Sequence, residues 1–408
     1  MTLRITTTLR KRVASAAVAL LWLSSLGALG ITGEACIDTV GLLGDGGGGP
    51  LEPTDRAGDA GDGGDSGDGA AEAATDASPG CGPTKKDCLG GACVNGACAP
   101  VRLTLDESNV VTDVTVFGGY FFYRVGGPGQ PGSIVRCPTK GCAAERKEIV
   151  SVAAWDGTFA MTVRADGVYY LHPGPSSVTV ARCPFDGCPA GGPELLSPSL
   201  GDVAHQIVVH EGLVYFAASG NVWSCPVAGC RPPAAPPVAL APLASTPGGM
   251  ALYGGQLVYS ERGDATGVGS RVLRVPLDGG APTAYPQPPN APFRVVDVSP
   301  VGFVTASFAI AGGQHGKVVL YSGSPPLDTF QELNQFISLA GDAEHVYFTT
   351  TGTPSLRRKK WLATYESTDT LFSGSAWGLA LDPVSVFFTV VGTPGVSTDP
   401  PAVYRLAK

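Results

Sequence analysis

The sequence predicts an all-β protein, and three observations support this prediction. The chain of 408 residues contains 57 glycines and 35 prolines, which interrupt helices, while its valines and aromatic residues favour strands. A tight turn followed by an aromatic strand recurs through the C-terminal three quarters of the chain. A pair of cysteines recurs with a similar period. We therefore expect short strands arranged in a repeated unit.

The repeated unit is defined by its turn and aromatic strand, and seven copies begin 40–48 residues apart. They are FGGYFFYRV (117–125), ADGVYYL (165–171), HEGLVYFA (210–217), YGGQLVYS (253–260), SPVGFVTA (299–306), DAEHVYFT (342–349) and DPVSVFFT (382–389). A short apolar segment precedes each copy, and further strands follow most of them. Four strands per unit with a period in the low forties are typical of a β-propeller blade. Residues 101–408 are therefore predicted to form a seven-bladed β-propeller.

The two ends of the repeat region predict how the ring closes. The seventh unit stops after its third strand, AVYRLAK at 402–408. The segment VRLTL at 101–105 precedes the first unit and is expected to supply the missing fourth strand. This exchange would hide two sheet edges that otherwise invite aggregation.

Residues 1–35 are predicted to be an export signal, because basic residues precede an apolar run from Val13 to Gly30 that is rich in small residues. Two processing routes fit the residues after this run. Ala35 before Cys36 resembles a bacterial lipoprotein signal, in which the cysteine is acylated and becomes the lipid anchor. The two residues before Ala35 depart from that pattern, and simple secretion after Gly30 or Ala35 is the alternative.

Residues 36–80 are predicted to form a disordered Gly/Asp-rich linker. The net charge of the chain is −8, and most of the excess acid lies in this stretch, where the only base is Arg56. The stretch lacks aromatic residues and cannot bury enough surface to fold. Because the rest of the chain has little net charge, no basic field for nucleic acid is expected.

Ten of the 11 cysteines are predicted to form disulfides, since an exported chain meets an oxidising compartment. Three pairs occur in CPxxGC hairpins that join the third and fourth strands of a unit: Cys137 and Cys142, Cys183 and Cys188, Cys225 and Cys230. The equivalent hairpin of the fourth unit, VPLDGG at 275–280, lacks both cysteines together, as bonded pairs would. These pairs are therefore interpreted as staples on hairpins.

Residues 81–100 are predicted to form a small cystine-rich segment that contains Cys81, Cys88, Cys93 and Cys98. Two disulfides are expected there, and the three ways of connecting four cysteines all stay open. Zinc is the alternative, but the spacing departs from the paired knuckles of structural zinc sites. No metal or cofactor is expected in the chain.

The candidate site is the mouth of the central channel, because the sequence contains no familiar catalytic or cofactor motif. Counting back from the tight turns reaches the start of the innermost strands. The residues expected around the mouth are Asp113, His205, Arg294 and Trp377, with Trp155 and Asp156 in an adjoining loop. An acid, a base and an aromatic ring would suit a polar or sugar-like ligand. The alternative is a water-filled channel rimmed by ordinary loop residues.

A second candidate surface is the basic stretch SLRRKKWLA at 355–363, on the third strand of the sixth unit. Its charges beside Trp361 suggest a short basic edge for anionic glycans or phospholipid headgroups. The favoured interpretation is protective, because charged edge residues prevent sheets from pairing with other chains.

The pattern over 101–408, with its linker and cystine-rich segment, resembles exported bacterial propeller proteins with TolB-like repeats. The resemblance implies the fold and not the activity, because propellers host binders, scaffolds, lyases and hydrolases. The first hypothesis is a monomeric binding or scaffold module of the cell envelope, lipid-anchored or secreted, with an unidentified protein or glycan partner. It would contact a membrane only through the lipid anchor. The alternative is a lyase or hydrolase acting on polysaccharide or another polar substrate at the mouth.

Overall fold

The computed structural model describes residue 81 and most of residues 87–408. The gaps are residue 95, 105–109, 128, 144, 154–159, 175–176, 201–205, 264–268, 287–292, 300–301, 308–315, 323–326, 333–335, 351–354, 362–366 and 392–399. The predictions for the export signal, the linker and Cys36 therefore lie outside the described residues. Within the described ranges every regular element is a strand, and no helix there is long and apolar enough to span a membrane.

Apart from one two-stranded ladder, the described strands form seven antiparallel four-stranded sheets, which confirms the all-β prediction. Blade 1 consists of β4 (Val111–Phe117), β5 (Tyr120–Val125), β6 (Gly132–Pro138) and β7 (Lys147–Val152), and blade 2 of β8 (Met161–Arg164), β9 (Gly167–Pro173), β10 (Val178–Cys183) and β11 (Glu194–Leu195). Blade 3 consists of β12 (Ile207–His210), β13 (Leu213–Ala218), β14 (Asn221–Pro226) and β15 (Val238–Pro242), and blade 4 of β16 (Pro247–Tyr253), β17 (Gln256–Glu261), β18 (Arg271–Pro276) and β19 (Thr283–Ala284). Blade 5 consists of β20 (Phe293–Ser299), β21 (Gly302–Ser307), β22 (Gly316–Tyr321) and β23 (Leu327–Glu332), and blade 6 of β24 (Phe336–Gly341), β25 (His345–Thr350), β26 (Ser355–Lys360) and β27 (Asp369–Ser373). Blade 7 consists of β28 (Ala376–Leu381), β29 (Ser385–Val390), β30 (Ala402–Ala407) and the N-terminal strand β3 (Val101–Arg102).

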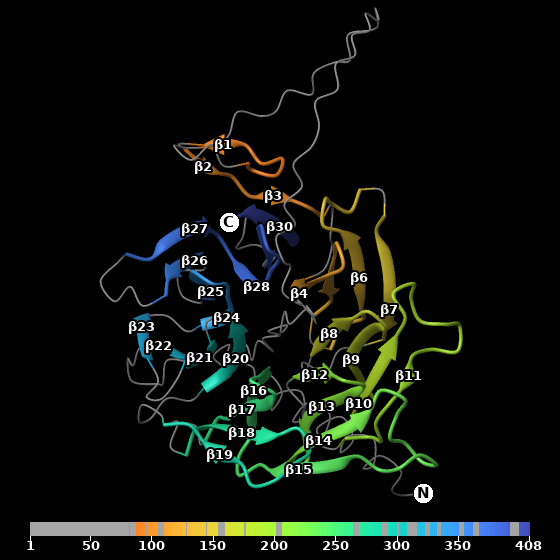
Figure 1. Ribbon diagram of the computed structural model, residues 1–408. Coiled ribbons are helices and arrows are strands. Elements are labelled where there is room, and N and C mark those ends of the chain that lie inside the picture. Colours follow the sequence, from red (N-terminus) through yellow and green to blue (C-terminus); the bar gives the residue numbers. More distant parts are fainter. Residues whose placement is uncertain are drawn as a thin grey trace, which may run out of the picture. The chain divides into compact units, whose positions relative to one another are not determined.

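The seven sheets form a closed ring around a common axis (Figure 1). The first strand of each blade contacts the first strand of the next blade, and β28 of blade 7 contacts β4 of blade 1. Each blade therefore has two neighbours, as the repeat pattern predicts for a seven-bladed propeller.

The N-terminal strand β3 completes the last blade, as predicted from the truncated seventh unit. It pairs antiparallel with β30, with Val101 opposite Arg405 and Arg102 opposite Tyr404. Beyond β3, the Leu103 amide donates to the Val403 carbonyl at 2.8 Å. The ring is thus closed by backbone hydrogen bonds between the two ends of the repeat region.

Aromatic second strands fill the spaces between blades and explain why the repeats fold this way. Side chains of β5 point alternately to the two faces of its sheet. Phe121 packs toward blade 7, where its ring lies 6.0 Å from that of Phe387, and Phe122 packs against blade 2. Both Phe121 and Phe122 are fully buried. Two-sided burial is the reason these strands are continuous apolar runs.

Two devices recur among the described turns between first and second strands. Gly118 and Gly119 in blade 1 have φ of 60° and 81°, the type I′ geometry that favours glycine in a two-residue hairpin. In blades 6 and 7 an aspartate replaces this device. The Asp342 carboxylate accepts hydrogen bonds from the amides of Glu344 and His345, at 2.9 and 2.8 Å.

Replacing Asp342 with alanine is expected to destabilise the fold by about 1 kcal/mol at pH 7, since a capping side chain is lost. Although partial burial opposes it, these two amide hydrogen bonds and the Lys408 ammonium hold the pKa of Asp342 below its ordinary value of 3.8. Because the pKa of Asp342 is lower in the folded than in the unfolded state, the carboxylate stabilises the fold when the pH is above the unfolded-state pKa. This contribution is lost as the pH falls through the folded-state pKa. Urea unfolding of both proteins should show the difference between them disappearing below pH 3.8; a constant difference across that range would contradict this role.

All ten predicted disulfide cysteines are paired. The three hairpin pairs bond within their own motifs, between the third and fourth strands of blades 1 to 3. In the cystine-rich segment Cys81 bonds to Cys93 and Cys88 to Cys98, around the short ladder of β1 (Cys93–Val94) and β2 (Ala97–Cys98). The structure thus selects one of the three connectivities that the sequence left open.

Both interpretations of the basic stretch at 355–361 need correction. Strand β26 is not an edge, because β27 pairs with it and the Asp369 carboxylate binds the Arg358 guanidinium at 2.9 Å. Trp361 is only 8% exposed, packs in a core cluster between blades 5 and 6, and donates its indole N–H to the Asp342 carbonyl. The indole is therefore not presented to a glycan or a lipid, and the charges do not protect an edge.

Candidate functional site

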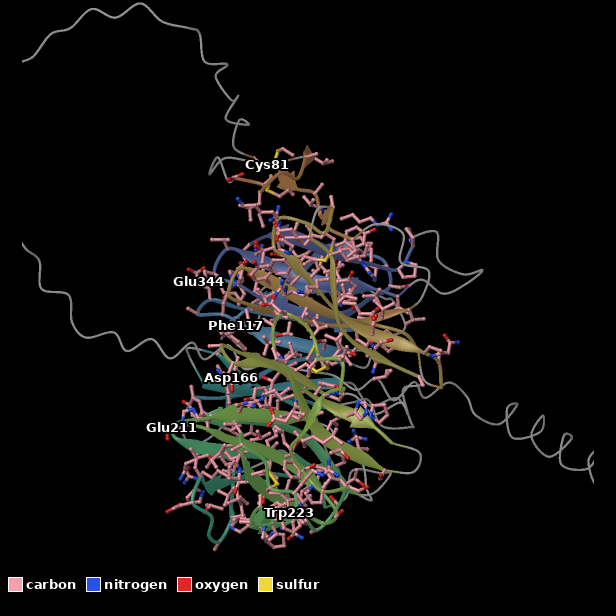
Figure 2. The ribbon with its side chains drawn as sticks, turned by 90° about the vertical axis from the view of Figure 1, so that its right-hand side faces the viewer. Cys81, Phe117, Asp166, Glu211, Trp223 and Glu344 are labelled. Atoms are coloured by element: carbon pink, nitrogen blue, oxygen red, sulfur yellow. A yellow bond between two sulfur atoms is a disulfide. The ribbon has the colours of Figure 1, made fainter. Side chains whose placement is uncertain are left out.

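The candidate site lies on the face of the ring where the first strands begin. The turns between first and second strands gather on the opposite face, where Phe117, Asp166, Glu211 and Glu344 are labelled in Figure 2. The residues predicted around the mouth come at the other end of the same strands. They therefore share a face with the connections that enter each blade.

Bulges mark the start of the first strand in five blades. Register shifts occur between Val111 and Val114 in β4 and between Ala376 and Leu379 in β28, and β16, β20 and β24 shift at the equivalent place. A bulge leaves backbone groups without ladder partners and turns side chains away from their regular direction. Three of the predicted mouth residues, Asp113, Arg294 and Trp377, lie within these bulges.

Hydroxyl groups on the second strands satisfy the backbone groups that the bulges leave over. In blade 7 the Thr389 hydroxyl accepts from the Gly378 amide at 2.7 Å and donates to the Thr112 carbonyl of blade 1 at 2.9 Å. In blade 6 the Thr349 hydroxyl accepts from the Ser338 amide and donates to the Trp377 carbonyl of blade 7. These relays join the inner strands of successive blades and fix the backbone of the mouth.

In blade 1 an ion pair replaces the hydroxyl. Arg124 occupies the position on β5 that Thr389 has on β29, and its Nε lies 3.2 Å from the Asp113 carboxylate and 2.8 Å from the Thr112 hydroxyl. The Thr112 hydroxyl in turn donates to Asp113 at 2.8 Å. Asp113 is 3% exposed and Arg124 is 5% exposed. Burial raises the pKa of Asp113, while the Arg124 charge and the Thr112 hydrogen bond oppose the rise.

Trp377 is the half-buried side chain at this position of blade 7. Every other residue of β28 is buried. The next residue, Gly378, touches blade 1 so closely that a Cβ there would lie 2.3 Å from the Thr112 carbonyl oxygen. The structure therefore brings the bulge of Trp377 next to the bulge of Asp113, on adjacent blades.

The other predicted mouth residues are placed only in part. Arg294 lies in β20, and its side chain is outside the described residues, as are His205, Trp155 and Asp156. The sequence prediction missed Arg124, which binds the carboxylate of Asp113. A signal for it existed, because a charged residue inside the apolar strand YFFYRV requires a buried partner.

The part of the channel mouth that the structure describes, called the rim below, thus combines the paired acid Asp113 with the partly buried indole of Trp377. The Asp113 charge is already balanced by Arg124, so it does not supply a free carboxylate for a cation or for acid–base chemistry. Trp377 offers an apolar ring with a polar N–H, a combination that suits the faces of sugars and peptide groups. No metal or cofactor ligand set is present among the described rim residues.

Comparison with known proteins identifies the fold and nothing finer. No protein-family model and no curated protein sequence matches this chain. A solved structure of YCF48 bound to D1 peptide is 9% identical, with a TM-score of 0.52, and covers 78% of this chain and 97% of its own. A puromycin hydrolase is 16% identical, with a TM-score of 0.54 over 76% of this chain, which spans only 55% of the hydrolase.

The β-propeller domain of the Trilobed protease from Pyrococcus furiosus matches with a TM-score of 0.51, 10% identity and coverage of 73% of this chain and 95% of that domain. That domain is described as having an open velcro topology. Here β3 closes the ring. The fold therefore defines a seven-bladed β-propeller protein with a closed ring, and its function must be argued from the rim.

Proposed function

We propose that this protein is a binding or scaffold module that works outside the cytoplasm and engages a glycan or peptide partner at the rim around Trp377. The observation that carries the proposal is the partly buried Trp377, whose backbone is fixed by the hydroxyls of Thr349 on blade 6 and Thr389 on blade 7. Rigid aromatic side chains on a preformed surface contribute strongly to binding, because little conformational freedom is lost.

The five disulfides support the extracytoplasmic part of the proposal, because such bonds persist in oxidising compartments. A lipid anchor at Cys36 and a place in the cell envelope remain part of the proposal. Mass spectrometry of the mature N-terminus tests the anchor: an acylated Cys36 supports it, and an unmodified start elsewhere removes it.

The enzyme alternative required a carboxylate and a histidine within hydrogen-bond reach at the mouth. Asp113 instead pairs with Arg124, and His205 lies outside the described residues. The peptidase likeness is a likeness of fold at low identity. No observation at the described rim favours catalysis over binding.

Replacing Trp377 with alanine tests the binding proposal. The full chain would be screened against a glycan array and against envelope extracts, and hits would be measured with both proteins. We expect W377A to weaken binding by about tenfold or more while the protein stays folded.

The matched control is Trp223→Ala, which removes another half-buried indole, on the third strand of blade 3 (labelled in Figure 2). This variant should bind as the wild type does. Equal binding by wild type and W377A would contradict the role of the rim, and equal losses in both variants would indicate an indirect effect.

A further inference from the structure

The CPxxGC hairpins do more than close their own loops, because each one also forms a hydrogen bond to the preceding blade of the ring. The second cysteine of each motif donates its backbone amide to a carbonyl on the outer part of that blade. Cys188 bonds to Ile149 at 3.0 Å, Cys230 bonds to Leu196 at 2.7 Å, and Cys142 bonds to Leu103 at 3.0 Å. The disulfide loops are therefore contacts between blades as well as staples within a blade.

The loop of blade 1 differs from the other two in the segment to which it is hydrogen-bonded. Ile149 belongs to blade 1 and bonds to the loop of blade 2, and Leu196 belongs to blade 2 and bonds to the loop of blade 3, so each of these bonds joins blades that are consecutive in the sequence. Leu103 belongs to residues 101–104, called the closing segment below, which pair with β30 in blade 7. Among these three hairpin disulfides, the one in blade 1 is the one that bears on the seam where the two ends of the repeat region meet.

A second hydrogen bond ties the same loop to β30. The Arg405 guanidinium donates to the carbonyl of Thr139, inside the CPTKGC loop, at 2.8 Å. The same guanidinium also donates to the Leu89 carbonyl in the cystine-rich segment. Arg405 thus connects β30 to two disulfide-bonded loops, one in blade 1 and one in the cystine-rich segment.

The disulfide and the closing segment also bury one another. Cys137 and Cys142 are 0% and 5% exposed and share one core cluster with Leu103 and Val403. The Leu103 amide donates to the Val403 carbonyl, and the Val403 amide donates to the Thr104 hydroxyl. The closing segment therefore limits the access of a reductant to this disulfide.

We propose that the Cys137–Cys142 disulfide is a redox-sensitive latch on the closure of the ring. A dithiol attacks one sulfur of the bond and then closes on itself. Two electrons and two protons pass to the protein, which gains the Cys137 and Cys142 thiols, while the dithiol becomes a cyclic disulfide. The loop then loses its constraint, Cys142 and Thr139 no longer hold their places, and the closing segment separates from β30.

Amide hydrogen exchange in the full chain tests the latch. Three proteins are compared: the wild type, C137A/C142A, and the matched control C225A/C230A, which removes an equally spaced disulfide from blade 3. We expect C137A/C142A to speed exchange at the amides of Leu103 and Val403 by at least about tenfold. The control should leave both amides as protected as in the wild type.

Unchanged protection of Leu103 and Val403 in C137A/C142A would overturn the proposal, and so would equal loss of protection in the control. If C137A/C142A does not fold, the proposal is tested instead by reducing the disulfide in the wild-type protein. It is treated with dithiothreitol, alkylated and mapped by mass. Molecules alkylated at Cys137 and Cys142 should have lost protection at Leu103, and retained protection in them would refute the latch.

Discussion

Replacing Asp113 with alanine is expected to lower the free energy of unfolding by about 3–5 kcal/mol, because it removes the carboxylate that balances a buried guanidinium. Arg124 is 5% exposed, and its Nε lies 3.2 Å from the Asp113 carboxylate. The Thr112 hydroxyl would also lose its acceptor. Urea unfolding monitored by tryptophan fluorescence measures the change.

The double variant D113L/R124M is the control for this prediction. It removes both charges and keeps apolar volume, so its cost should be clearly smaller than that of D113A. If D113A matches the wild type in stability but loses ligand binding, Asp113 would be a rim residue that meets the ligand, and the structural account of this ion pair would be wrong.

Replacing Leu103 with proline is expected to cost about 4 kcal/mol or more, since it combines loss of a backbone donor with loss of a buried side chain. The Leu103 amide bonds to the Val403 carbonyl, and the side chain is 4% exposed in the core cluster of blades 7 and 1. The seam should open first, so early protease cuts should fall near the closing segment.

Val384→Ala serves as the control for the seam, because Val384 lies on blade 7 and is 57% exposed. Its effect should stay within about 0.5 kcal/mol. Stability of L103P equal to that of the control would mean that the closing segment contributes nothing to the fold.

Local patterns made most of the fold predictable. Each blade repeats the same order of turn, aromatic strand and hairpin, so one interpretation could be checked seven times along the chain. The closing strand followed from a missing fourth strand, and the hairpin disulfides followed from paired loss of cysteines in VPLDGG. The closure of β3 on β30 and the three hairpin disulfides confirm these predictions.

Long-range contacts set the limits of prediction from sequence. The bond between Cys88 and Cys98 depends on how the cystine-rich segment folds, and no spacing rule selects it. Trp361 looked accessible beside four charges, yet it enters a core between two blades. Asp113 lies near the start of the inner strand β4, but its partner Arg124 could be found only by asking what a buried charge requires.

A cross-link between the two ends of the repeat region tests the central claim most directly. Arg102 and Tyr404 lie directly opposite each other in the antiparallel pair of β3 and β30. The variant R102C/Y404C should form a disulfide spontaneously during oxidative folding, and mass mapping should recover one peptide pair that links the two positions. V101C/Y404C, one residue out of register, should not. Failure of R102C/Y404C to link in folded protein, or linkage of either cysteine to another strand, would contradict the closed ring.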